Sequence, residues 1–453
     1  MHRKHYGLIL FFGTCSLLIS CSPDLKAPQP LAGKANFSRS IAIGGDFLAG
    51  YQDGALYMDG QNRSIPALLA RVFQSAGGKT FRQALMPDNQ GLGLNLKPWE
   101  SSYVSATYLG PIIDCRGLSS LQPLHNALPP SEARPYLDGT SGNAMQNLSV
   151  PFAQVGQLFD PSLGLDASTG NKNPYYNRFA GNPGTSTVYS DAVNQHASFF
   201  TLWVGMEDIF NYAQNGGMNP VIASGSSFGA YLDTLLTGLC ANGAKGVMAT
   251  LPDFRSFPFY TLIPYNGAIL TQTKADSLNL VFSNAGINNI HFTAGSNAFV
   301  IADPAVPSHY RQLTSAEFVL MDCPSDSLKC QGMGVLPTLP LPDRYVLTSS
   351  EVANIDGSII TYNNIIIQKA AQYGVALVDM HAYFNTVNSG MKWDGVNYNS
   401  QFITGGFYSL DGYHPNQKGY ALLANEFVKV INRIYGSSLP TVNCPDCNGV
   451  LFP

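Results

Sequence analysis

Five short runs of mostly apolar residues alternate with amphipathic segments along this chain. The runs are rich in branched and aromatic side chains and are bounded by turn residues, which is typical of strands buried in a parallel sheet. Strands that alternate with helical segments indicate an α/β fold. We therefore expect a three-layer α/β/α sandwich with about five parallel strands, at residues 40–45, 198–205, 246–252, 297–303 and 375–380.

The segments between these runs carry helix signals. Ser64 can cap a helix that runs from residue 65 to the glycines at 77–78, and Pro66 is tolerated in its first turn. Segments 230–243 and 361–374 both end in a glycine stop. From about 416 to 435, apolar residues recur at steps of three and four, which predicts a helix with one buried stripe. The stripe comprises Tyr420, Leu423, Phe427, Val430 and Ile434.

Residues 1–21 have the pattern of an export signal rather than of a folded segment. A basic start precedes an apolar run that is too short and too near the terminus to span a membrane. Small Ser20 stands directly before Cys21, as in bacterial lipoprotein signals, in which the cysteine is lipidated. An ordinary secretory signal with a chance cysteine is the alternative. Polar residues and proline in 22–38 predict a tether.

Charge and cysteine content narrow the class of protein. Only 12% of residues are charged and the formal net charge is −4, so nothing favours nucleic acid as a partner. Six of the eight cysteines lie beyond residue 21, and an even number in an exported protein favours disulfides. Cys323 and Cys330 form the easiest local pair. For Cys444 and Cys447, in CPDC, we expect a local disulfide; a redox pair or half a zinc site are the alternatives.

The sharpest chemistry in the sequence is near its end, where Asp411 and His414 stand three residues apart before the last predicted helix. A carboxylate placed in this way can fix the imidazole tautomer and leave the other ring nitrogen to act as a general base. By spacing alone, a solvated turn with two polar residues carries equal weight.

The Asp-x-x-His-Pro sequence before a closing helix resembles the last block of the SGNH (GDSL-type) hydrolases, especially an exported lipoprotein branch from Bacteroidetes. The segments AGYQDGALY, NLSVPFAQV and LWVGMEDIFNYA resemble earlier blocks, so the likeness extends over nearly the whole chain after the signal. It implies a flavodoxin-like α/β/α domain over 39–436 with long loop insertions, and a tail at 437–453. It also implies hydrolysis of acyl or acetyl esters on lipids or glycans without a cofactor or metal, and an anchor in the outer membrane on its periplasmic or surface side.

The catalytic blocks of that family map onto this sequence only in part. The first block reads Gly-Asp-Ser-Leu, with serine as the nucleophile. Aligned on residues 49–51, the serine falls on Asp46; aligned on 45–46, it falls on Phe47. Asp411 and His414 match the family's last block.

The two groups that stabilise the oxyanion in that family are also replaced. The glycine of the second block falls on Phe152, and the asparagine of the third block falls on Glu207. An ionised Glu207 would place negative charge where negative charge develops during ester hydrolysis, and each lost donor is worth about 3 kcal/mol of barrier. The remaining pocket positions of these blocks are Gly44, Gly45, Gly205 and Asp208.

These replacements predict that the standard serine mechanism is lost or altered. Asp46 could attack carbon directly as a carboxylate nucleophile. Ser227, in Gly-x-Ser-x-Gly at 225–229, offers an alternative nucleophile of the α/β-hydrolase type. The main rival is a catalytically inactive protein that binds a glycan or another ligand, and a divalent cation held by the carboxylates and His414 is a further alternative. The aromatic residues expected around such a pocket are Tyr51, Tyr57, Trp203, Tyr212 and Tyr413.

Overall fold

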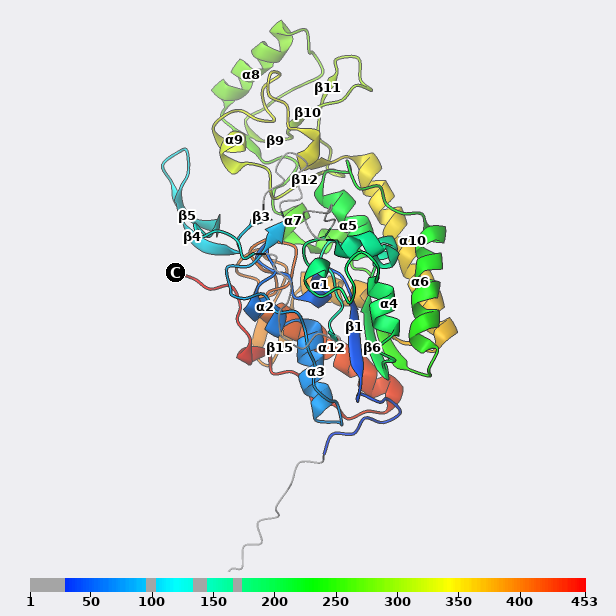
Figure 1. Ribbon diagram of the computed structural model, residues 1–453. Coiled ribbons are helices and arrows are strands. Elements are labelled where there is room, and N and C mark those ends of the chain that lie inside the picture. Colours follow the sequence, from blue (N-terminus) through cyan, green and yellow to red (C-terminus); the bar gives the residue numbers. More distant parts are fainter. Residues whose placement is uncertain (1–28, 95–102, 133–144, 166–172) are drawn as a thin grey trace, which may run out of the picture.

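The computed structural model describes residues 29–94, 103–132, 145–165 and 173–453. Its centre is a parallel sheet of four strands in the order β1-β6-β7-β14, and helices cover both faces (Figure 1). α3 (Ile65–Gln74) packs on α12 (Gln417–Tyr435) on one side, whereas α10 (Ser349–Tyr373) packs on α5 (Met206–Gln214) and α6 (Gly225–Cys240) on the other. The strands are β1 (Ser40–Gly44), β6 (Phe199–Trp203), β7 (Lys245–Ala249) and β14 (Ala376–Val378). The predicted three-layer α/β/α sandwich is confirmed.

The sheet has four strands instead of about five because one predicted strand lies elsewhere. Segment 297–303 divides between β9 (Gly295–Asn297), which pairs with β8 (Ala268–Leu270), and β10 (Val300–Ala302), which pairs with β11 (Tyr310–Gln312). Its apolar side chains belong to a second hydrophobic cluster away from the central sheet. An apolar run predicts a buried strand, but it does not say in which core the strand is buried.

The predicted helices end within a few residues of their predicted stops, and α3 and α12 also begin where the sequence predicts. Ser64 Oγ accepts the backbone N–H of Ala67 and caps α3 (Ile65–Gln74). α12 (Gln417–Tyr435) buries the predicted stripe except for Ile434, which is 48% exposed because the neighbouring Tyr435 takes the inward position. α6 (Gly225–Cys240) and α10 (Ser349–Tyr373) both begin before their predicted segments.

The other helices and strands are short. The helices are α1 (Asp46–Ala49), α2 (Met58–Asn62), α4 (Val188–Val193), α5 (Met206–Gln214), α7 (Pro258–Thr261), α8 (Gln272–Asn284), α9 (Ser325–Lys329) and α11 (Met380–Ser389). The strands are β2 (Gly93–Leu94), β3 (Tyr103–Val104), β4 (Thr107–Ile113), β5 (Ser119–His125), β12 (Phe318–Val319), β13 (Val346–Leu347), β15 (Met391–Trp393) and β16 (Val396–Tyr398).

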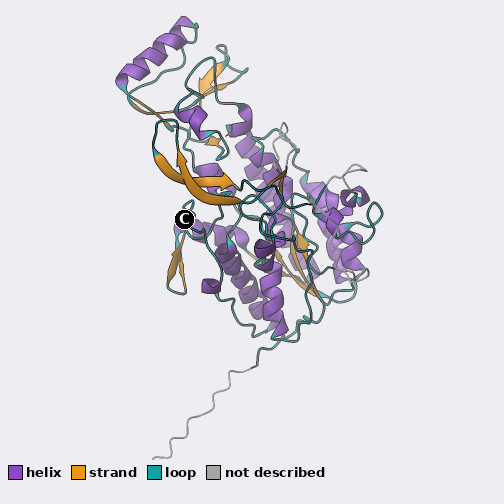
Figure 2. Cartoon of the chain, turned by 60° about the vertical axis from the view of Figure 1, so that its left-hand side comes forward, coloured by secondary structure: helices purple, strands orange, loops and turns teal. Residues whose placement is uncertain are grey.

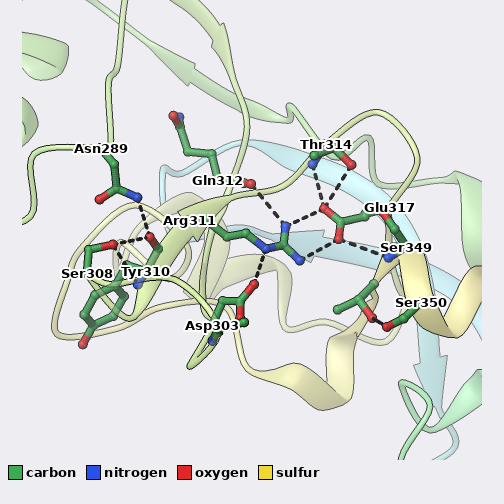
Figure 3. A network of polar contacts seen from close by, with 12 residues as sticks. Asn289, Asp303, Ser308, Tyr310, Arg311, Gln312, Thr314, Glu317, Ser349 and Ser350 are labelled. Carbon is green, nitrogen blue, oxygen red and sulfur yellow. Dashed lines mark hydrogen bonds and ion pairs between the residues drawn. The ribbon is translucent and has the colours of Figure 1, made fainter.

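Residues 263–347, which we call the inserted unit, form the lobe at the top of Figure 1. This lobe has its own hydrophobic cluster, to which α8 contributes Leu278 and Phe282. Figure 3 shows a polar network that ties the lobe to the central unit. The Arg311 guanidinium donates to Asp303 and to the buried Glu317 carboxylate, and Glu317 also accepts the backbone N–H of Ser349 at the start of α10.

The disulfide in the described residues joins Cys115 to Cys330, so the predicted Cys323–Cys330 pair is wrong. Cys323 is instead buried in the hydrophobic cluster of the inserted unit. Cys444 and Cys447 are buried thiols, so the expected local disulfide is wrong as well. The observed bond links the turn of the β4–β5 hairpin to the inserted unit. Figure 2 shows this curved hairpin beside the inserted unit. Spacing could not predict a pair separated by 215 positions.

No helix in the described ranges is long and apolar enough to cross a membrane. The predicted signal, Cys21 and the first part of the tether lie outside the described residues.

Candidate active site

The predicted site residues meet at the carboxyl edge of the sheet, where ligand sites of open α/β sheets lie. β1 ends at Gly44, and Asp46 opens the short helix α1 directly after it. β6 ends at Trp203 and leads through Gly205, in a left-handed conformation (φ 98°), into α5, which carries Glu207 and Asp208. The loop before α12 brings Asp411 and His414 to the same edge.

His414 lies between two carboxylates. Its Nδ1 is 2.9 Å from Asp411 Oδ2, and its Nε2 is 3.3 Å from Asp46 Oδ2. The backbone N–H groups of Tyr413 and His414 donate to the other oxygen of Asp411, so the predicted orienting carboxylate is fixed by its own loop. Asp46 therefore holds the place that the nucleophile takes opposite the base, whereas Phe47 packs in the hydrophobic core.

The backbone at Phe152 keeps a conformation that suits glycine. Its φ of 63° is unusual for a residue with a side chain and carries strain. The N–H of Phe152 donates to Asp46 Oδ1 at 2.7 Å, and its ring packs edge-on against Tyr51. The amide expected to stabilise an oxyanion is thus present, but a carboxylate of the protein occupies it.

Glu207 contacts the start of α1 from the other side. Its Oε1 accepts the backbone N–H of Asp46 at 2.9 Å. A Cβ added to Gly45 would lie 1.5 Å from the same oxygen, so Glu207 requires glycine at position 45. Where the family has an aspartate at the position of Gly45, this chain supplies a carboxyl group to that space from α5.

Burial and charge together set the protonation of the site. Burial alone would lower the pKa of His414, but the charges and hydrogen bonds of Asp411 and Asp46 outweigh this effect and raise it to about 9. Burial favours the neutral form of Asp411, yet the contacts with His414 leave its pKa below the ordinary value. Burial and the charge of Asp46 both raise the pKa of Glu207 well above its usual range. At neutral pH the centre thus holds an imidazolium ion.

A cavity of about 250 Å³ opens beside this centre. His414 and Asp411 form part of its wall, whereas Asp46, which is 3% exposed, is not among the described residues of the wall. Of the expected aromatic residues, Tyr51 and Tyr413 line the cavity, while Trp203 belongs to the hydrophobic core. The rest of the described wall comprises Gly54, Leu94, Val104, His125, Phe152, Gln214, Asn215, Met218, Phe259, Asp322, Arg344 and Tyr345.

Ser227 is not brought to His414. It is exposed in the first turn of α6, where its N–H and hydroxyl both contact the hydroxyl of the capping Ser224. A nucleophile elbow needs a strand directly before the serine, and the segment before Ser224 forms none. Both ring nitrogens of His414 are already bonded to Asp411 and Asp46.

Two buried carboxyl groups beside the centre hold neighbouring loops, a role that the sequence does not predict for either of them. Asp53 accepts the backbone N–H of Leu410 at 2.9 Å and the hydroxyl of Tyr57 at 2.7 Å, and burial raises its pKa to about 6. Asp208 accepts the N–H of Val155, and burial raises its pKa to about 7. An aspartate before a glycine, as Asp53 is, normally indicates only a turn, so the sequence gives no signal for its long-range role.

The divalent-cation alternative finds no support in the described part of the chain, where no group of three or more His, Cys, Asp or Glu side chains could hold a metal ion.

A four-stranded parallel sheet between helices, with a histidine and its orienting carboxylate at the carboxyl edge, is the framework of a hydrolase-type α/β/α protein. A family model described as GDSL-like Lipase/Acylhydrolase matches residues 138–427, which is more than half of the chain. The chain belongs to this family. The match does not reach the segment that carries Asp46.

Solved structures similar to this chain include a mutant acetyl-xylooligosaccharide esterase from Geobacillus stearmophilus (11% identity, 88% of this chain and 96% of that chain, TM-score 0.35). Another is a phospholipase A1 from Streptomyces albidoflavus (13% identity, 88% of this chain and 99% of that chain, TM-score 0.32). A third is an extracellular lipase from Streptomyces rimosus (10% identity, 87% of this chain and 98% of that chain, TM-score 0.33). Scores this low leave the family assignment resting on the family model. No curated protein matches the sequence.

Proposed function

We propose that this chain is a GDSL-family protein that binds a small acylated ligand without hydrolysing it. The observation that carries the proposal is the position of His414 between two carboxylates, with Asp46 in place of the serine. A general base must be neutral to accept a proton, but a histidine with a pKa of about 9 is charged at neutral pH. Its Nε2 proton is directed at Asp46 rather than toward a ligand.

The groups that would stabilise the oxyanion are also engaged or replaced within the protein. Hydrolysis needs preorganised donors that are free to bind the developing oxyanion. The Phe152 amide instead binds Asp46, and Glu207 offers a carboxyl group in place of an amide. Asp46 is not in the wall formed by the described residues, which argues against its use as a carboxylate nucleophile. The charges of the site satisfy one another, and the cavity beside them stays open.

The wall of this cavity indicates the kind of ligand. Aromatic rings from Tyr51, Phe259 and Tyr413 give it apolar surface, and the amide groups of Gln214 and Asn215 add hydrogen-bonding capacity. Ligand sites typically combine an apolar lining with a few polar groups, over about 300–1,000 Å³. A cavity of about 250 Å³ lies just below this range, which fits a short acyl ester or one acetylated sugar unit.

Calorimetric titration of the chain from residue 22 onward with acetylated and deacetylated monosaccharides, together with an ester-turnover assay, tests this proposal. We expect binding that favours the acetylated sugars, with no turnover above that of His414→Ala. Met218→Arg should block the cavity and weaken binding at least tenfold; Met218 is half-exposed, so the fold tolerates the change. Ile360→Arg, at an exposed position of α10, is the matched control. Ester turnover that disappears in His414→Ala would show that the chain is an enzyme after all.

We also propose that the protein is exported and is held at the outer membrane by a lipid on Cys21. The basic start, the apolar run and Ser20 before the cysteine support this proposal. Cells that express the full chain should incorporate a labelled fatty acid into it, and Cys21→Ala should abolish the label. Cys15→Ala, within the apolar run, is the control and should retain it. Equal labelling of all three chains, or of none, contradicts the anchor.

A further inference from the structure

The inserted unit contains a second and larger cavity, of about 760 Å³. Its walls come from the segment 262–270, from the start of α8, from residues 296–299 around the end of β9, and from α9 with the residues after it. Arg116, in the turn of the β4–β5 hairpin, completes the wall, and the neighbouring Cys115–Cys330 disulfide fixes this turn beside α9. None of these residues belongs to the site around His414.

The inside of this cavity is mainly apolar. Two of its apolar side chains are strongly exposed to solvent, Ile269 at 73% and Leu262 at 44%. An apolar ligand that covered them would be bound by the hydrophobic effect. The remaining apolar wall residues are Ile263, Pro264, Ala268, Leu270, Phe299, Leu328, Val335 and Leu336.

The mouth of the cavity is cationic in a chain whose net charge is negative. Arg116, Lys274 and Lys329 are exposed residues of the wall, and its described residues include no Asp or Glu. One carboxylate outside the wall, Asp114, approaches Lys329 at 3.8 Å and also interacts with Arg116. The described wall therefore carries three cations and no carboxylate beside its apolar surface.

We infer that this cavity binds a single-chain anionic lipid, with its acyl chain between Ile269 and Phe299 and its headgroup at Lys274, Lys329 and Arg116. The apolar wall explains the chain and the cationic mouth explains the sign of the headgroup. The volume lies in the usual range for a site that encloses one such molecule. This site is independent of the proposed function of the His414 cavity.

Calorimetric titration of the intact, oxidised chain tests the inference, with dodecanoate, dodecyl phosphate, dodecanol and dodecyltrimethylammonium as probes. Both anions should bind at least tenfold more tightly than the cation, with the alcohol between them, and the tighter anion identifies the preferred headgroup. From octanoate to dodecanoate, affinity should rise by up to about fourfold for each methylene that enters the cavity. Equal affinity for anion and cation, or no binding of any probe, overturns the inference.

Two pairs of variants assign the binding to this cavity. Ile269→Glu should weaken dodecanoate binding at least tenfold, because it adds charge to the apolar wall; Leu280→Glu, at a 62% exposed position of α8 outside the wall, should leave it unchanged. Lys274→Gln should weaken binding several-fold, whereas Lys392→Gln, at an exposed position of β15, should not. Equal effects within either pair would mean that the lipid binds elsewhere.

Discussion

The two sides of His414 differ in how much of the family pattern they keep. On one side, the loop before α12 holds Asp411 by two backbone amides and orients His414 through Nδ1, as the sequence predicts. On the other side, which we call the replaced side, Gly45, Asp46 and Glu207 stand where the family has aspartate, serine and asparagine. On this second side, Phe152 has the left-handed backbone conformation that suits the glycine expected at its position. The difference shows that one half of the motif can match the family while the other half places carboxyl groups against the same histidine.

The residues at positions 45, 46 and 207 depend on one another. The Glu207 carboxyl group fills the space that a side chain at position 45 would need. Asp46 binds the amide of Phe152 and faces Nε2 of His414, so it satisfies the two groups that a serine and an oxyanion would otherwise engage. Each of these residues thus fits the next, and together they hold Asp46 opposite His414.

Restoring the family pattern on the replaced side should give the largest effect. The triple variant Gly45→Asp, Asp46→Ser, Glu207→Asn regains a hydroxyl, frees the Phe152 amide and removes one of the two carboxylates that keep His414 charged. We expect turnover of short acyl esters to rise at least about 100-fold over the wild-type protein, because a single oxyanion donor is worth about that factor. Assays with acetyl and butyryl esters measure it.

The control for the triple variant is the same protein with His414→Ala, which should lose the gained activity. If the triple variant folds but hydrolyses no ester, then Asp411 and His414 do not support catalysis. That result would contradict the view that this side of the site still matches the family.

The steric dependence between positions 45 and 207 should appear in stability. Gly45→Ala should cost about 3 kcal/mol, because the new methyl group would overlap the Glu207 carboxyl group. In the background of Glu207→Ala the same change should cost much less. Urea unfolding of the two single variants and the double variant measures the coupling.

Gly357→Ala is the matched control, since an added Cβ there meets no atom within 4 Å and alanine favours a helix. It should be neutral or should stabilise by about 0.5–1 kcal/mol. Additive costs at positions 45 and 207 would contradict the steric explanation.

Titration of His414 can separate the effect of Asp46 on its pKa from the effect of Asp411. Asp411 remains in Asp46→Asn, whereas the charge that the replaced side adds is lost, so the pKa of His414 should fall by one unit or more from about 9. NMR of histidine labelled at its ring nitrogens measures this shift directly. Asp276→Asn, at an exposed position of α8, should leave it unchanged.

The same shift has a consequence for stability. The pKa of folded His414 is above the unfolded value of about 6.5, so its stabilisation is complete below pH 6.5 and is lost as the pH rises to about 9. Over this window the free energy of unfolding should fall by about 3 kcal/mol from this group. Asp46→Asn should show a smaller loss, and an identical loss in both proteins would contradict the role of Asp46.

The sequence predicts the central unit better than it predicts the inserted unit. Local signals define α3 and α12, because the Ser64 cap and the apolar stripe act within a few residues. The Cys115–Cys330 bond and the role of Asp53 depend on contacts between distant segments, which neither spacing nor periodicity contains. In the site, the motif predicts the pair Asp411 and His414, but only the structure shows that Asp46 is hydrogen-bonded to the imidazole, whereas Phe47 only packs its ring against it.

The smallest effect is expected at Ser227, which matches a nucleophile motif by sequence alone. Ser227→Ala should leave ligand binding, ester turnover and stability unchanged, because this exposed hydroxyl contacts only Ser224 among the bonds assigned to it. Ser224→Ala removes the side-chain cap of α6 and should cost about 1 kcal/mol without changing turnover. Thermal unfolding and the ester assay distinguish the two. Any turnover lost in Ser227→Ala would move the chemistry from the carboxyl edge of the sheet to α6, which the two bonded nitrogens of His414 argue against.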